Sequence, residues 1–287
     1  MGDLPYSRPR TSGSTPSVSS SRPLVNDGTA LRPISRRDIE PYTAASATAL
    51  SAAYHSRARA DVVEAARRCE MSGSVLDVGC AAGMVGAMLL ERGLVDEVTG
   101  IEMNPAVAQL ASSRLTHVIT GDATVPAVLP PGPFDGAILA DVLEHLAEPE
   151  QLLARVLARL RANARVVVSL PNVQHFRVIA DLALNGTWRY TEEGICDRTH
   201  LRFFTFTTAL ELLDTASLRP EVVLGTMTPR AARLCARVRA AAPFLANQFV
   251  FGCTRMNSDQ ESRGGEGPPQ PTPSPLSGHD TPVSGSP

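Results

Sequence analysis

The chain has 287 residues, 43% of them hydrophobic, and a net charge of −2, which suits one domain of moderate size with flanking segments, or two small domains. Its 27 strongly basic residues are all Arg, so the sequence excludes chemistry that requires a lysine: a pyridoxal phosphate Schiff base, a P-loop nucleotide site or a protein kinase. No apolar run reaches the ~20 residues of a membrane span, and the near-neutral charge disfavours a nucleic-acid-binding surface.

The cysteines and the N-terminal segment indicate the cellular setting. No cysteine lies within three residues of another, which disfavours a zinc knuckle or a C-x-x-C redox pair, and we expect no metal site. A chain of this length does not need a disulfide framework, and residues 1–21 contain no apolar stretch typical of a secretory signal. We therefore expect a reducing, cytoplasmic setting without a membrane partner.

Composition divides the chain into three parts. Residues 1–33 are rich in Ser, Pro and Arg and are predicted to form a disordered arm, and residues 257–287 are predicted to form a disordered tail dominated by Pro, Gly and Ser. Residues 34–256 are expected to fold as a single domain.

Within that domain, segments with helical and strand patterns alternate. In chain order we predict one or two helices at 43–69, a strand at 74–78, a helix at 84–92, a strand at 97–102, a helix at 105–115, strands at 117–120 and 136–140, a helix at 149–160, a strand at 165–170, a helix at 207–216, a strand at 221–224, a helix at 230–241 and a strand at 247–253. This alternation indicates an α/β fold, with a mainly parallel sheet and helices on both faces.

The sharpest motif follows the first strong strand. Residues 75–83 read VLDVGCAAG, a strand that enters a loop of small residues before a helix, which allows a ligand to approach the backbone closely. A dinucleotide-binding G-x-G-x-x-G starting at Gly79 would require Gly at position 81 and Gly or Ala at 84, where the sequence has Ala81 and Met84. The run instead fits D-x-G-x-x-x-G from Asp77.

Two further acidic residues stand at strand ends. Glu102 ends the second strand of the motif region, where a carboxylate can accept hydrogen bonds from both ribose hydroxyls of a nucleoside, and Asp122 follows the third. Each also has a structural explanation: Asp77 as a turn residue, Glu102 as a charge stabilised by a helix dipole, and Asp122 as an Asx-turn.

Together with the segment FDGAILADVLEHL at residues 134–146, these motifs resemble the class I S-adenosylmethionine-dependent methyltransferases over about Ser74 to Cys253. The resemblance implies a seven-stranded, mainly parallel, Rossmann-like sheet and S-adenosylmethionine as methyl donor. It also implies a role for Asp122 at the adenine amino group. The donor-binding residues implied are Asp77, Gly79, Cys80, Ala81, Gly83, Glu102, Met103, Asp122, Ala123 and Asp141. Ala81 stands where many family members have Gly, and Cys80 is interpreted as packing rather than as a nucleophile.

The acceptor side is expected in an insertion at about residues 171–206, after the fifth strand. A hydroxyl acceptor needs a base with a pKa near working pH, for which His200 and His145 are the candidates. The Leu-Glu-His segment that ends at His145 is similar to one in ubiquinone-type O-methyltransferases. The run ICDRTHLRFFT at 195–205 resembles a segment of methyltransferases from bacterial glycan and natural-product pathways.

Further acceptor contacts are predicted at Tyr190, Arg198 and Arg202, since Arg can clamp a phosphate or carboxylate in a bidentate fashion. The arginines could equally pair with Asp197 or Glu193, and both histidines could be structural.

The sequence thus predicts a methyltransferase acting on a small molecule, first by O-methylation of a sugar, a nucleotide-linked or a natural-product intermediate. N- or C-methylation and a non-catalytic donor-binding subunit stay open as alternatives. We expect no nucleic-acid partner, and the sequence leaves the oligomeric state open. An NAD-dependent oxidoreductase is disfavoured by the failed glycine pattern and by the absence of a Tyr-x-x-x-Lys pair.

Overall fold

The computed structural model describes residues 24–25, 32–43 and 59–256. The predicted tail, most of the predicted arm, and residues 44–58 of the predicted helical segment lie outside the described residues. Within the arm, β1 (Leu24–Val25) and β2 (Arg32–Pro33) form a two-stranded antiparallel sheet.

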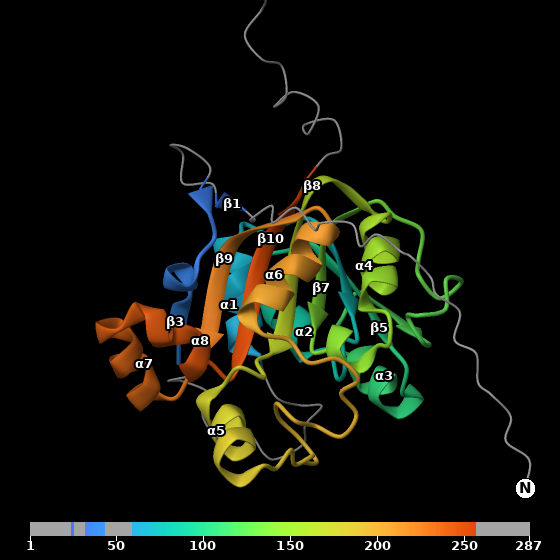
Figure 1. Cartoon of the computed structure of the whole chain (residues 1–287). Coiled ribbons are helices and arrows are strands. Elements are labelled where there is room, and N and C mark those ends of the chain that lie inside the picture. Colours follow the sequence, from blue (N-terminus) through green and yellow to red (C-terminus); the bar gives the residue numbers. More distant parts are fainter. Residues whose placement is uncertain (1–23, 26–31, 44–58, 257–287) are drawn as a thin grey trace, which may run out of the picture.

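The main sheet has eight strands in the order β3-β9-β10-β8-β7-β4-β5-β6 (Figure 1). They are β3 (Glu40–Tyr42), β4 (Ser74–Val78), β5 (Glu97–Glu102), β6 (His117–Thr120), β7 (Phe134–Ala140), β8 (Leu160–Pro171), β9 (Leu218–Thr226) and β10 (Gln248–Arg255). All pairings are parallel except those of β10, which runs antiparallel between β8 and β9.

The sheet confirms the predicted α/β class and its seven predicted strands, but it has eight strands rather than seven. The additional strand, β3, adds to the edge beside β9. It has only three residues, one of them Pro41, and none is buried. An edge strand of this kind tolerates proline and shows no hydrophobic alternation, so the sequence pattern did not reveal it.

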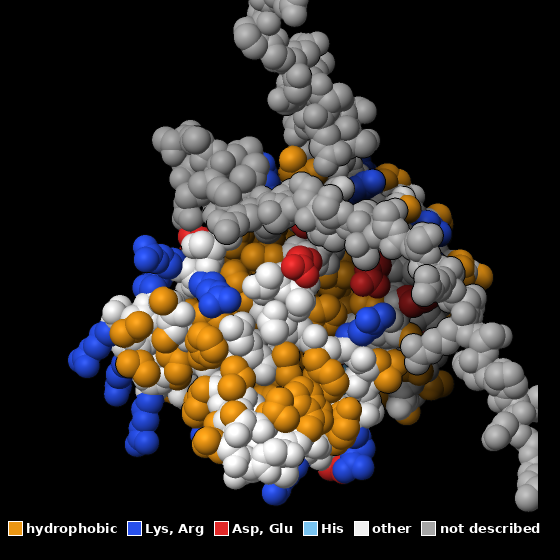
Figure 2. All heavy atoms as spheres, viewed as in Figure 1, with side chains coloured by type: hydrophobic (Ala, Val, Ile, Leu, Met, Phe, Trp, Pro, Cys, Tyr) orange, Lys and Arg blue, Asp and Glu red, His pale blue; other side chains and the backbone are white. Residues whose placement is uncertain are grey.

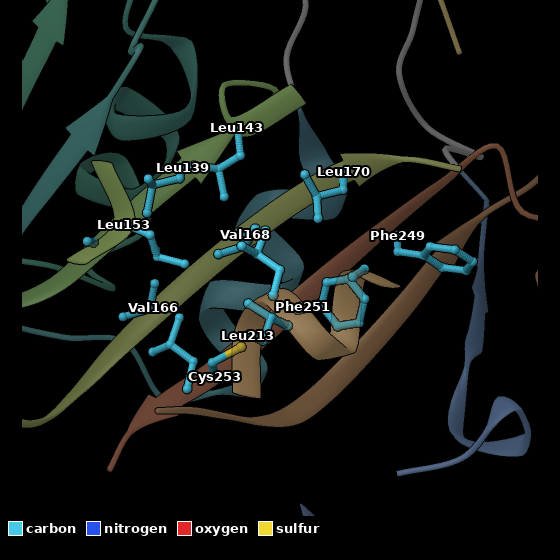
Figure 3. Close-up of a cluster of buried hydrophobic side chains, with 14 of the residues drawn as sticks. Leu139, Leu143, Leu153, Val166, Val168, Leu170, Leu213, Phe249, Phe251 and Cys253 are labelled. Atoms are coloured by element: carbon cyan, nitrogen blue, oxygen red, sulfur yellow. The ribbon is translucent and has the colours of Figure 1, made fainter. Parts of the chain in front are cut away.

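Helices cover both faces of the sheet (Figure 1). On one face, residues of α1 (Ala60–Arg68) and α2 (Met84–Glu91) pack in or against a cluster that includes Val75, Ile138 and Val167. On the other face, α4 (Pro149–Leu157) and α6 (Phe206–Thr215) pack in a larger cluster with Leu139, part of which Figure 3 shows. The sheet is therefore the central layer of the domain.

Successive residues of strand β8 contribute to the hydrophobic clusters on both faces of the sheet. Val166 and Val168 belong to the larger cluster, whereas Val167 between them belongs to the other, because successive strand residues point to opposite faces. A strand buried on both faces is continuously apolar, which explains the run that made it recognisable in the sequence.

The insertion after β8 contains a helix that the sequence analysis did not predict, α5 (Phe176–Asn185). His175 caps its N-terminus, and its C-cap, Gly186, has the left-handed φ of +60° that favours glycine. None of its residues is buried, and Figure 2 shows hydrophobic side chains gathered on the part of the surface where α5 lies in Figure 1.

Three further α-helices are α3 (Pro105–Ala111), whose N-terminus Asn104 caps before Pro105, α7 (Pro229–Arg237) and α8 (Ala242–Leu245). No helix among the described residues is long and apolar enough to cross a membrane.

Candidate active site

A cavity of about 930 Å³ opens at the carboxyl ends of β4, β5 and β7. The antiparallel strand β10 begins at the same edge, so its first residue, Gln248, also lines the cavity. Ligands bind at this edge of open α/β sheets because loops diverge there. Eleven of the predicted site residues line it: Asp77, Gly79, Cys80, Ala81, Glu102, Met103, Asp122, Ala123, Asp141, His145 and His200.

The glycine loop turns tightly between β4 and α2. The backbone N–H groups of Gly79 and Cys80 donate to the Ile101 carbonyl at 2.8 and 3.0 Å, which ties the loop to β5. Gly79 has φ +70°, and a Cβ there would meet the Val142 side chain at 2.7 Å. Glycine at this position therefore opens the cavity as well as permitting the turn. Gly83 caps α2 and is not among the residues that line the cavity.

Asp77 is a buried carboxyl group beneath the loop. It is 3% exposed, and its Oδ2 atom has no hydrogen-bond partner among the described residues. Burial, together with the nearby negative charge of Glu102, raises the pKa of Asp77 to about 7. An orphaned buried oxygen at a cavity wall marks a position where a ligand donor group would be stabilising.

Glu102 ends β5 with its carboxylate held by the backbone. Oε2 accepts from Ala81 N–H at 3.1 Å, and Oε1 accepts from Asn104 N–H at 2.8 Å. The carboxylate thus links the glycine loop to the start of α3. Each oxygen still has a lone pair that can accept a further hydrogen bond.

Asp122 and Cys80 both have the structural features that the sequence analysis considered, an Asx-turn for Asp122 and an unreactive thiol for Cys80. Asp122 Oδ1 accepts from the backbone N–H and the hydroxyl of Thr124, the geometry of an Asx-turn, while the residue remains exposed at the cavity. Burial raises the pKa of the Cys80 thiol, the reverse of what an activated thiolate requires.

Asp141 belongs to a network that the sequence did not reveal. Arg59, just before α1, pairs with Asp141 and with Asp61, the latter at 2.9 Å. Ser169 donates to Asp141 at 2.8 Å, and Gln248 also donates to it. Although burial acts against its charge, these two carboxylates raise the pKa of Arg59 above its ordinary value. Arg59 therefore stays ionised at the cavity wall, paired with Asp141, whose φ is +58°.

The two candidate bases come together although they lie far apart in sequence. The rings of His145, on the short helix η3 (Leu143–His145), and His200, in the insertion, lie with centroids 4.8 Å apart. His200 Nδ1 contacts the Ile195 carbonyl at 3.0 Å, and His145 Nδ1 contacts the Thr199 hydroxyl at 3.1 Å. Burial, and then the neighbouring His200, lowers the pKa of His145.

Glu144 is a further residue that sequence reasoning missed. It is 1% exposed, it lines the cavity, and both carboxylate oxygens lack a partner among the described residues. Burial and the nearby charge of Asp141 raise its pKa well above its ordinary range. The signal was present in the sequence as a glutamate beside the apolar residues Val142, Leu143 and Leu146, because a buried charge is costly unless it is paired or binds a metal.

The three predicted acceptor contacts do not line this cavity. Arg198 is largely exposed and pairs with Glu192, and Arg202 Nε donates to the Ala147 carbonyl at 2.8 Å. Tyr190 is 52% exposed, with its ring centroid 6.4 Å from that of Phe203. Among the described residues, the arginines thus form ion pairs with neither Asp197 nor Glu193, the two partners considered from the sequence.

The chain is similar in sequence to known methyltransferases. A model of the methyltransferase domain family matches residues 51–220. The mitochondrial ubiquinone biosynthesis O-methyltransferase of Schizosaccharomyces pombe is 26% identical over 110 residues, which cover 36% of this chain and 39% of that protein. The Xanthomonas euvesicatoria enzyme of the same name is 29% identical over 143 residues, which cover 44% and 58%. The chain thus spans less than two thirds of the length of these relatives.

The similar solved structures share little sequence with this chain. A SAM dependent methyltransferase from Archaeoglobus fulgidus is 17% identical with a TM-score of 0.49, covering 68% of this chain and 94% of that one. The 1,6-didemethyltoxoflavin-N1-methyltransferase of Burkholderia thailandensis, solved with S-adenosylhomocysteine, is 20% identical with a TM-score of 0.49, covering 71% and 80%. Because the family model matches more than half of the chain, the protein belongs to this family of methyltransferase domains.

Proposed function

We propose that this protein transfers the methyl group of S-adenosylmethionine to a hydroxyl group of a small molecule. The observation that carries the proposal is one cavity with two chemically different parts. Carboxylates at the ends of β4 and β5 line one part, and two imidazoles from η3 and the insertion line another. A nucleoside-bearing donor suits the first, and proton removal from an acceptor suits the second.

The donor part has the groups that the nucleoside and the amino acid of S-adenosylmethionine require. Glu102 keeps acceptor capacity for the ribose hydroxyls, and the orphaned Oδ2 of Asp77 can accept from a ligand. Gly79 leaves the space that a Cβ would fill. When bound, the donor supplies a methyl group made electrophilic by its sulfonium sulfur. The other donor contacts that we propose are Cys80, Ala81, Met103, Asp122, Ala123 and Asp141.

At the acceptor part, His200 is the proposed general base. If its Nδ1–H donates to the Ile195 carbonyl, Nε2 carries the lone pair and is free to take a proton. His145 is the second candidate. The base would hold the acceptor hydroxyl ready for an in-line displacement, and much of the acceleration would come from this alignment.

The acceptor class that we propose is a sugar, a nucleotide-linked or a natural-product intermediate. The cavity volume of about 930 Å³ supports a donor together with a small acceptor. The contacts of Arg198 and Arg202 favour a role in holding the insertion rather than in gripping an acceptor.

Donor binding is tested by calorimetry with S-adenosylhomocysteine. Glu102→Ala should weaken binding by ~1–3 kcal/mol, because hydrogen bonds to a charged group are lost. The matched control is Glu97→Ala, on the same strand but exposed at its other end, which should bind as the wild type does. Equal affinities for both variants would remove Glu102 from the donor site.

Catalysis is tested by measuring methyl transfer to a panel of phenols, sugars and sugar nucleotides. His200→Gln should lower kcat ~10²–10⁴-fold for a hydroxyl acceptor while donor affinity stays unchanged. Unchanged kcat and KM would make His200 structural and His145 the next candidate. Turnover of amines alone would indicate N-methylation, and donor binding without any turnover would indicate a non-catalytic subunit.

A further inference from the structure

Three side chains at the cavity wall have the composition of a metal site. Glu144, His145 and His200 each offer one ligand atom, and these atoms lie within 4.8 Å of one another. Glu144 and His145 belong to η3, whereas His200 comes from the insertion after β8. All three line the cavity, so a bound ion would face the space where an acceptor is expected.

The state of Glu144 is a second, independent observation. Its carboxylate is almost completely buried, and neither oxygen has a hydrogen-bond partner within the described part of the chain. Arg59 interacts electrostatically with Glu144, but its ion pairs are with Asp61 and Asp141. A buried carboxylate is stabilised in its charged form when it is paired or coordinates a metal, so a bound cation would satisfy both oxygens of Glu144.

Both imidazoles contact a backbone carbonyl oxygen through Nδ1, as metal-binding histidines commonly do: His145 contacts the Thr199 carbonyl at 3.3 Å, and His200 the Ile195 carbonyl at 3.0 Å. Asp197 Oδ1 accepts the Thr199 hydroxyl proton at 2.6 Å, so the Thr199 oxygen can accept from His145 Nδ1–H at 3.1 Å. His200 Nδ1–H can donate to the Ile195 carbonyl. Both bonds leave the Nε2 lone pairs available as ligands, and such outer contacts fix the tautomer in metal sites.

We propose that Glu144, His145 and His200 bind one divalent cation of the zinc class, with at least one coordination position open to the cavity. Two histidines and one glutamate form a ligand set of catalytic zinc sites. With bonds of about 2.1 Å, tetrahedral ligands stand about 3.4 Å apart, so side chains now up to 4.8 Å apart would close around the ion by rotation. This replaces our expectation from the sequence that no metal site exists.

The role of the ion rests on the proposed methyltransferase function. A hydroxyl oxygen of the acceptor bound at the open position would ionise more readily, with its proton released to solvent water. The new O–CH3 bond forms as the S–CH3 bond breaks, and the electron pair of that bond stays on sulfur. In the loaded protein the two histidines hold the ion, and the ion activates the hydroxyl in their place.

The test measures metal binding directly, without donor or acceptor. Chelator-treated full-length protein is titrated with Zn²⁺ by calorimetry and with Co²⁺ by absorption. The wild type should bind one equivalent tightly and give Co²⁺ ligand-field bands. Glu144→Gln should weaken this binding at least ~100-fold, and Thr199→Val, which removes an outer contact, ~10–100-fold. His117→Ala, which removes an exposed histidine on β6, is the matched control and should bind as the wild type does.

Two results would overturn the proposal. One is the absence of a stoichiometric site in the wild type, which needs no variant and so does not depend on any variant folding. The other is equal Zn²⁺ affinity in Glu144→Gln and His117→Ala when both show the wild-type melting temperature. The outcome is separable from the proposed function: normal S-adenosylhomocysteine binding without metal binding leaves the methyltransferase assignment intact, with the histidines as bases. Metal binding without donor binding would count against the proposed function alone.

Discussion

Asp77 and Glu144 are buried carboxyl groups that line the same cavity, and neither has a full set of hydrogen bonds among the described residues. Leaving such groups unpaired destabilises the folded protein, so the structure retains them at a cost. Both can be stabilised by a ligand: Asp77 by a donor group of S-adenosylmethionine, and Glu144 by a cation. At the scale of the residue, these unpaired carboxyl groups are the clearest indication that the cavity binds a ligand.

The burial of Asp77 predicts a pH dependence of stability. An aspartate in an unfolded chain titrates near pH ~3.9, whereas the pKa of Asp77 is raised to about 7. Between these values the folded state holds a proton that the unfolded chain releases, so this group lowers the free energy of unfolding as pH rises. The free energy of unfolding of Asp77→Asn, measured relative to that of the wild type, should therefore increase by on the order of 2–3 kcal/mol from pH 5 to pH 8.

Urea unfolding at the two pH values measures this difference. The exposed Asp96→Asn variant is the control and should follow the wild type at both. A constant difference between Asp77→Asn and wild type would mean that Asp77 titrates normally in the fold.

At the scale of the element, α6 and α5 show opposite uses of an amphipathic helix. Five residues of α6 are buried, whereas none of α5 is, although both helices are ten residues long. Helices of this length depend on packing for their stability. Helix α6 therefore belongs to the core, whereas α5 lies at the surface with a cap at each end.

Leu213→Ala should lower the free energy of unfolding by about 2–5 kcal/mol. Its side chain is fully buried on α6 within the cluster of Figure 3, and its removal leaves a cavity between the helix and the sheet. The matched control is Leu184→Ala on α5, where the side chain is 82% exposed and stability should hardly change. Comparable losses in the two variants would show that α5 packs against something in solution.

At the scale of the whole molecule, the described part contains a complete sheet with both faces covered. A chain shortened to residues 24–256 keeps β1 beside β2 and removes segments whose composition is too polar to build a core. Its melting temperature should stay within about 3 °C of the full chain, and its affinity for S-adenosylhomocysteine should not change.

Differential scanning calorimetry and titration of the shortened chain measure both quantities. A large fall in melting temperature would show that a removed segment packs on the domain. Loss of donor binding alone would instead assign that segment to the cavity.

The sequence by itself determined what depends on neighbouring residues. The glycine loop at 75–83, the acidic strand end at Glu102 and the seven strands were all recognisable, because a turn, a cap or a buried strand has a local composition. The short edge strand β3 and the exposed helix α5 were missed, since neither is marked by a buried face.

Only the tertiary structure decided which distant side chains meet. Arg59 reaches Asp141 across 82 residues, and His145 meets Thr199 across 54, because parallel strands bring their carboxyl ends, and the loops that follow, to one edge of the sheet. No spacing in the chain encodes these pairs. The fold and the donor motif could therefore be predicted from local pattern, whereas the Glu144–His145–His200 cluster arises only when the insertion packs against η3.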